Sequence, residues 1–265
     1  MTGTSGRIVR AGTFALVASA VGGVVLLAGE AVLARTRRYA EPELGLALRS
    51  TVGRVDAPLL RLVLLGDSAA LGVGVDRVGD TVGGQLARLL AEGVGTPGGG
   101  RQVRLSSVGV SGSRSTDLAT QVARALLGEH PDVAVILVGA NDATGLRRPG
   151  DAAAHLGAAV RRLRAAGVRV VVGTCPDLGA VRAIAPPLRQ LVGYVGRLTA
   201  RAQADAVLEA GGAVVDLAAE TGPVFRADAG TLCHDGYHPS ADGYRVWAHA
   251  LLPAVATAAA ATRHG

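Results

Sequence analysis

Three polar residues of this sequence have the types and spacing that catalysis by a serine nucleophile requires. Ser68 follows the apolar run Leu62–Leu65 in the stretch LLGDSAALG. Asp235 and His238 are three residues apart in the stretch CHDGYHPSADGY. A serine hydroxyl is a poor nucleophile until a base accepts its proton, and a histidine base needs a group that holds its ring. Within one turn, the carboxylate of Asp235 can reach one ring nitrogen and leave the other facing Ser68.

Each of these stretches also has a simpler interpretation when it stands alone. Gly-Asp-Ser is common turn chemistry, and an Asp-x-x-His stretch is common at a capped helix start, with Ser240 as a candidate cap. Asp67 and Asp142 are interpreted as turn and capping groups rather than as acid or base groups. The catalytic interpretation therefore depends on the motifs occurring together.

Acyl transfer develops negative charge on a carbonyl oxygen, so a site for it must offer hydrogen-bond donors there. Three candidate donors are visible: the backbone N–H of Ser68 at a helix start, the backbone N–H of Gly112, and the side-chain amide of Asn141. Singly, Gly112 is typical of a turn and Asn141 of a turn or cap. Their joint occurrence after successive apolar runs favours the catalytic interpretation over three separate turns.

The elements that would position these residues are predicted from hydropathy. Five apolar runs of strand length alternate with longer segments of helical periodicity, which predicts βαβ units in a doubly wound α/β sandwich with a parallel sheet. The predicted strands are Leu62–Leu65, Val103–Val108, Val133–Val138, Val168–Val172 and Ala213–Leu217. The predicted helices are Thr81–Glu92, Thr116–Leu127, Asp151–Ala166, Leu188–Ala210 and Ala241–Ala260. Active sites of such sheets collect at the carboxyl ends of the strands, where the polar motifs fall.

Composition excludes several classes of function. The net charge is +6 in 265 residues, but the basic residues are scattered and aromatic residues make up 3%, too few for stacking on bases, so we expect no nucleic-acid partner. The two cysteines, Cys175 and Cys233, are too few for a disulfide scaffold and lack the partners of a zinc site. We expect no metal and no cofactor, and we hypothesise one disulfide between these cysteines if the domain is exported.

The N-terminus carries a 19-residue stretch without a charge, residues 11–29. This length can span a bilayer, so residues 1–38 are predicted to be a membrane anchor or an uncleaved signal segment, with a buried core helix as the alternative. Residues 39–60 are predicted to be a linker and residues 61–260 the catalytic domain. We expect that domain on the extracytoplasmic side, although arginines flank the stretch on both sides and give no clear orientation.

Together, the motifs resemble the four sequence blocks of the SGNH hydrolases, also called the GDSL esterase/lipase family. The blocks are GDS, SGSRSTDL, GAND and DGYHPS, and the resemblance extends from about Arg61 to about Pro253. It implies a three-layer αβα sandwich, flavodoxin-like, with a five-stranded parallel sheet and a metal-free serine hydrolase. It also implies roles for the residues, with Ser68 as nucleophile, His238 as base and acid, Asp235 as orienting group, and Ser68, Gly112 and Asn141 as the oxyanion hole.

The family resemblance implies cleavage of a carboxylic ester, from a small molecule or a lipid, by an esterase, lipase or lysophospholipase-like enzyme. Ala69 stands where the family name has leucine, and Ser106-Ser107 replaces an asparagine often found before the block II glycine, which leaves the substrate open. The arginine- and alanine-rich composition and the stretch VVGTCPDLG resemble actinobacterial members of the family, many of which are predicted membrane-anchored esterases. An O-acyltransferase or carbohydrate deacetylase on the same fold, or a non-catalytic membrane-tethered binding module, are the alternatives, and the oligomeric state is not predicted.

Overall fold

Apolar, β-branched runs form the strands of one central sheet. The computed structural model describes residues 22–34, 36–37, 39–41, 48–95 and 99–262. All five residues of its central strand β4 are buried, as expected of a parallel strand covered on both faces. The five strands near the predicted runs are β2 (Leu59–Gly66), β3 (Gln102–Ser107), β4 (Val133–Leu137), β5 (Arg169–Gly173) and β6 (Ala213–Val215).

The sheet differs from the prediction at one edge. It has six strands in the order β1-β3-β2-β4-β5-β6, and the added strand β1 (Arg49–Val52) pairs antiparallel with β3 while the other pairs are parallel. This corrects the prediction of five parallel strands, and it corrects the prediction that residues 39–60 are only a linker. Strand β1 is short and alternates exposed with half-buried residues, so it produces no apolar run in the sequence.

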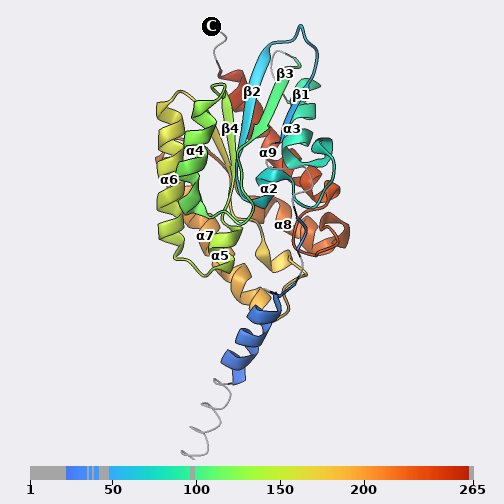
Figure 1. Ribbon diagram of the computed structural model, residues 1–265, viewed down its shortest axis with the longest axis vertical. Helices are drawn as coiled ribbons and strands as arrows, with labels where there is room; N and C mark the ends of the chain where they lie inside the picture. Colours follow the sequence, from blue (N-terminus) through green and yellow to red (C-terminus); the bar gives the residue numbers. More distant parts are fainter. Residues whose placement is uncertain (1–21, 35, 38, 42–47, 96–98, 263–265) are drawn as a thin grey trace, which may run out of the picture.

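The helices cover both faces of the sheet and so confirm a three-layer αβα sandwich (Figure 1). On one face, α3 (Val82–Ala91), α8 (Leu217–Ala227) and α9 (Ala241–Ala260) contribute to the larger apolar core. On the other face lie α4 (Leu118–Leu127), α6 (Pro149–Ala165) and α7 (Leu188–Glu209).

Helix α8 was not predicted, and it shortens a predicted strand. The run Ala213–Leu217 is strand only to Val215, because Asp216 caps α8 by accepting the N–H of Ala219. Gly222 and Pro223 lie inside this helix and weaken its sequence signal. The remaining predicted helices agree with the structure apart from their terminal residues.

The order of the parallel strands fixes where a site can form. The chain moves from β2 outward to β3 and then crosses to β4 on the other side of β2. Such a reversal opens a crevice at the carboxyl ends of the strands, because the connections on its two sides leave in opposite directions. The turn after β2 therefore lies between the loops that follow β3 and β4.

The N-terminal stretch is described only in part. Residues 22–34 are helical, whereas residues 11–21 of the predicted span lie outside the described residues. Among the residues that the structure describes, no helix is both long enough and apolar enough to cross a membrane. The described helix exposes several apolar side chains, namely Val24, Val25, Leu26, Val32 and Leu33.

Candidate active site

Ser68 is held at a sharp turn between β2 and the short helix α2 (Ser68–Leu71). Gly66 adopts a φ of +133°, and a Cβ there would lie 1.7 Å from the carbonyl oxygen of Leu137, so the position accepts only glycine. Asp67 caps α2, because its Oδ1 accepts the N–H of Ala69 at 3.0 Å. This confirms the interpretation of Asp67 as a capping group.

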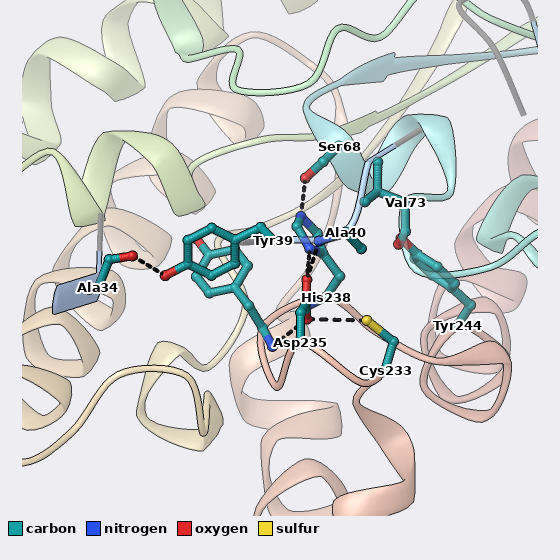
Figure 2. A network of polar contacts seen from close by, with 10 residues as sticks. Ala34, Tyr39, Ala40, Ser68, Val73, Cys233, Asp235, His238 and Tyr244 are labelled. Carbon is teal, nitrogen blue, oxygen red and sulfur yellow. Dashed lines mark hydrogen bonds and ion pairs between the residues drawn. The ribbon is translucent and has the colours of Figure 1, made fainter. Parts of the chain in front are cut away.

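The structure brings together the three residues predicted to be catalytic, as Figure 2 shows. His238 Nε2 lies 3.0 Å from Ser68 Oγ, and His238 Nδ1 lies 2.6 Å from Asp235 Oδ2. Ser68 and His238 are each 8% exposed, so the serine is screened from bulk water but open to a cavity described below. The three side chains form one hydrogen-bonded chain from carboxylate to hydroxyl.

The loop containing Asp235 and His238 is folded around the carboxylate. Asp235 Oδ1 accepts the N–H of Tyr237 at 2.7 Å and the N–H of His238 at 2.9 Å. The thiol of Cys233 donates to the same oxygen at 3.1 Å. The spacing of three residues between Asp235 and His238 therefore lets the carboxylate accept hydrogen bonds from backbone N–H groups as well as from the histidine ring. Ser240 ends the loop by capping α9, which confirms the predicted cap.

The charge of Asp235 is stabilised although its side chain is fully buried. Burial raises the pKa of this carboxyl, but hydrogen bonds from the His238 ring and from the N–H groups of Ala40, His238 and Tyr237 outweigh it and hold the pKa well below its usual range. In contrast, burial raises the pKa of Asp67 to about 6. Asp235 is therefore the permanent anion that can stabilise a protonated His238.

Donors for a developing oxyanion are present after three successive strands. Gly112 has a φ of +77°, and within the described part of the chain neither its N–H nor that of Ser68 has a hydrogen-bond partner. Asn141 lies in α5 (Ala140–Thr144), and its Nδ2 donates to the carbonyl oxygen of Ser113 at 3.0 Å. That bond places Asn141 beside the Gly112 loop and leaves its second amide hydrogen available.

Two buried side chains that were not singled out from the sequence hold these loops in place. Gln121 accepts the N–H of Gly66 at 2.7 Å, donates to the carbonyl oxygen of Gly66 at 2.8 Å, and donates to Ser113 Oγ at 3.1 Å. Gln203 accepts the N–H of Cys175 at 2.8 Å and donates to the carbonyl oxygen of Val138 at 2.9 Å. A signal existed for Gln121, since it occupies a core-facing position in the apolar face of α4.

Asp142 binds a residue of a neighbouring loop rather than a residue of its own helix. Its Oδ2 accepts both the N–H of Ser115 at 3.0 Å and the hydroxyl of Ser115 at 2.9 Å. The carboxylate thus ties the helix containing Asn141 to the loop containing Gly112. Its role is structural, as predicted, although it binds a neighbouring loop rather than capping α5.

The hypothesised disulfide is absent from the described residues, where Cys175 and Cys233 are free. Cys175 is packed in an apolar cluster beside α7, while the thiol of Cys233 is engaged by Asp235. Cys175 follows β5 and Cys233 lies in the loop before α9, and their side chains lie in different environments. The pairing prediction is therefore wrong for this structure.

A cavity of about 60 Å³ opens beside Ser68, His238 and Asn141. Its wall is largely apolar and comes from the loop after β5 and from helices α8 and α9. The apolar residues are Leu178, Val181, Leu217, Phe225, Leu232 and Trp247.

Comparisons with known proteins identify a matching family and similar sequences and structures. Residues 64–246 match the family GDSL-like Lipase/Acylhydrolase. The chain is 43% identical over 198 residues to the GDSL-like esterase Rv1075c of Mycobacterium tuberculosis, an alignment that covers 74% of this chain and 62% of the relative. It therefore spans less than two thirds of that relative's length.

Solved structures show the same fold at lower identity. The crystal structure of TesA superposes with a TM-score of 0.59 at 21% identity, covering 75% of this chain and 99% of TesA. A catalytic mutant of Axe2, an acetylxylan esterase from Geobacillus stearothermophilus, superposes with a TM-score of 0.55 at 20% identity, covering 77% of this chain and 95% of that one.

Proposed function

Since this chain belongs to the GDSL-like lipase/acylhydrolase family, we propose that it hydrolyses carboxylic esters through an acyl-enzyme on Ser68. The observation that carries this proposal is the chain of hydrogen bonds from Asp235 Oδ2 through His238 to Ser68 Oγ. Its curated relative is a GDSL-like esterase, which supports the same reaction.

The geometry supports a two-step reaction. In the first step, Ser68 Oγ attacks the ester carbonyl carbon while His238 Nε2 accepts its proton, and the ester C–O bond then breaks as His238 returns that proton to the leaving alcohol. In the second step, His238 accepts a proton from water as the water attacks the acyl carbon. The bond from that carbon to Ser68 Oγ then breaks, His238 returns the proton to Oγ, and the carboxylic acid leaves. Asp235 remains ionised in both steps and stabilises the imidazolium.

The oxyanion hole would act in both steps, because each passes through a tetrahedral intermediate. The unpartnered N–H groups of Ser68 and Gly112 and the side-chain amide of Asn141 are the donors that the structure offers. Donors fixed before the reaction stabilise the developing charge without reorganising. Asn141 is fixed by Ser113, which supports this role.

The cavity beside Ser68 supports the proposal that the preferred ester has a small apolar acyl group, which would occupy this cavity. Its volume of about 60 Å³ and its aliphatic and aromatic wall favour a short chain over a long one. Burial of each CH₂ group in such a pocket contributes about 0.8 kcal/mol until the space is filled. Activity should therefore rise over the first few carbons and then fall.

We also propose that the N-terminal stretch attaches the enzyme to a membrane with the catalytic domain on the extracytoplasmic side. The uncharged residues 11–29 and the exposed apolar side chains of helix 22–34 support attachment. The full chain is then expected in the membrane fraction and cleavable by protease added outside intact cells. Recovery with soluble proteins would contradict attachment, and protection from external protease would contradict the side.

A panel of p-nitrophenyl esters with acyl chains of increasing length tests the reaction. The wild-type chain should release p-nitrophenol, whereas Ser68→Ala should lose activity by roughly 10⁶-fold and keep its melting temperature. Equal turnover by the variant would contradict the proposal. Acyl transfer to an added sugar or alcohol in preference to water would identify an acyltransferase instead.

A further inference from the structure

The segment before the sheet, residues 39 and 40, contacts Asp235 from outside the loop that contains this carboxylate. The backbone N–H of Ala40 donates to Asp235 Oδ2 at 3.0 Å, and that oxygen is also the partner of His238 Nδ1 (Figure 2). The other donors to Asp235 come from its own loop and bind Oδ1. Ala40 is therefore the second donor on the oxygen that holds the histidine.

Tyr39 covers the same group with an aromatic side chain. Its ring lies 5.2 Å from the ring of Tyr237 and 6.4 Å from the ring of His238, both in edge-on orientation. Tyr237 in turn lies 5.1 Å from His238. These rings shield the hydrogen bond between His238 and Asp235, whose side chain has no exposed surface. A shielded carboxylate interacts more strongly with an imidazolium than a solvated one.

The segment is fixed at its N-terminal side. The hydroxyl of Tyr39 donates to the carbonyl oxygen of Ala34 at 2.8 Å, which ties the segment to the end of helix 22–34. Glu30 of that helix accepts the N–H of Leu188 at 2.8 Å, at the start of α7. In Figure 1 the helix of residues 22–34 leaves the domain beside the start of α7. The position of Ala40 thus depends on how the N-terminal helix is seated.

We propose that Tyr39 and Ala40 are positioning residues of the active site, which hold Asp235 Oδ2 toward His238 and couple the N-terminal helix to catalysis. The inference rests on the proposed hydrolase function. It also extends the catalytic domain, because residues 39–40 work in the site rather than linking an anchor to it. Since Ala40 acts through its backbone, its side chain gives no sequence signal.

The test compares Ala40→Pro with Ala40→Gly in the full chain. Proline lacks the N–H that donates to Asp235, and glycine keeps it. We expect A40P to lower kcat roughly tenfold, the effect of one hydrogen bond to a charged group, with KM and Tm close to those of A40G. Equal kcat in the two variants would overturn the proposal.

A second readout does not depend on activity. The proton on His238 Nδ1, followed by NMR in ¹⁵N-histidine-labelled protein and assigned by its loss in Asp235→Asn, should shift in A40P and not in A40G. An unchanged resonance in A40P would overturn the contact even if no ester were hydrolysed. Absence of ester hydrolysis by the wild-type chain, with the resonance shifted in A40P, would instead reject the proposed function and keep the positioning.

A further pair applies if A40P does not fold. Tyr39→Ala removes the ring that covers His238, and Tyr39→Phe keeps the ring but loses the bond to Ala34. Tyr39→Ala should lower kcat and shift the same resonance, and Tyr39→Phe, which loses only the tie to Ala34, should do both to a smaller extent. Identical behaviour of the two variants would contradict a positioning role for the ring.

Discussion

The two halves of the site each contain a buried carboxylate, and the two differ in charge. Asp67, in the turn that carries Ser68, is buried and has its pKa raised to about 6 by that burial, with one backbone donor, Ala69, on its Oδ1. Asp235 also has a fully buried side chain, but it accepts five hydrogen bonds, and its pKa lies well below the usual range. The hydrogen bonds to Asp235 outweigh the effect of its burial and keep it ionised, whereas the donors to Asp67 do not outweigh the burial of that carboxylate.

This difference separates a structural carboxylate, which directly precedes the proposed nucleophile, from the carboxylate proposed to act in catalysis. Asp67 precedes the proposed nucleophile, yet its side chain caps α2. Asp235 contacts the histidine ring and carries the charge that an imidazolium needs nearby. Proximity to the nucleophile in sequence is thus a poor guide to function here.

Replacing each carboxylate by its amide tests this difference, and the largest loss of kcat is expected here. Asp235→Asn should lower kcat by roughly 10⁴-fold, because the amide no longer stabilises the charged histidine or enforces its tautomer. Asp67→Asn keeps an oxygen for the Ala69 N–H and should retain kcat within a few-fold. Steady-state kinetics of both variants on one ester check this, and a loss in Asp67→Asn as large as that in Asp235→Asn would assign Asp67 to the chemistry.

Asn141 tests whether the oxyanion hole is built as the geometry indicates. Asn141→Ala should lower kcat by roughly 10²–10³-fold with little change in KM, because the donor acts on the tetrahedral intermediate rather than on bound ester. Thermal melts on the same preparation separate this from a role in the turn alone. Normal kcat with a lowered Tm would remove Asn141 from the site.

The contacts within the loop of Asp235 and His238 and within the turn of Ser68 were predictable because they are local. The contact between His238 and Ser68 joins residues 170 positions apart and was expected only because the motifs occur together. Asp235 and His238 lie three residues apart, and Gly66 precedes the nucleophile by two positions, so hydropathy and motif spacing place them. Ala40 was missed because its donor is a backbone N–H and its acceptor lies 195 residues away. Strand β1 was missed because pairing with β3, rather than its own hydropathy, makes it a strand.

The pKa values predict opposite effects of pH on stability. The folded pKa of Asp67, about 6, exceeds the ordinary value of 3.8, so the folded state binds more protons between these values and loses stability as pH rises through that window. The loss reaches about 3 kcal/mol at neutral pH. Asp67→Asn should therefore be more stable than wild type at pH 8 and equal to it below pH 4.

Urea unfolding of wild type and Asp67→Asn at several pH values measures this difference. The folded pKa of Asp235 is lowered, so its contribution is present above its ordinary pKa and is lost as the pH falls below it. Its effect therefore appears on the acid side, outside the window assigned to Asp67. A stability gap between wild type and Asp67→Asn that does not change with pH would contradict the shift.

The smallest effect is expected at Cys233. Its thiol is one of three donors to Asp235 Oδ1, and the two backbone donors remain when it is removed. Cys233→Ala should lower kcat, but the activation free energy should rise by less than about 1.5 kcal/mol, the value of one full hydrogen bond to a charged group. A larger loss, seen in the same kinetic assay, would mean that the loop around Asp235 needs the thiol.

Covalent labelling with a fluorophosphonate, followed by mass mapping of the modified peptide, tests the central claim most directly. The probe reacts only with a serine whose proton is accepted by a neighbouring base. The account predicts a single modified residue, Ser68, with labelling lost in Ser68→Ala and strongly slowed in His238→Ala, while both variants remain folded. Modification of another serine, or unchanged labelling of Ser68→Ala, would contradict it.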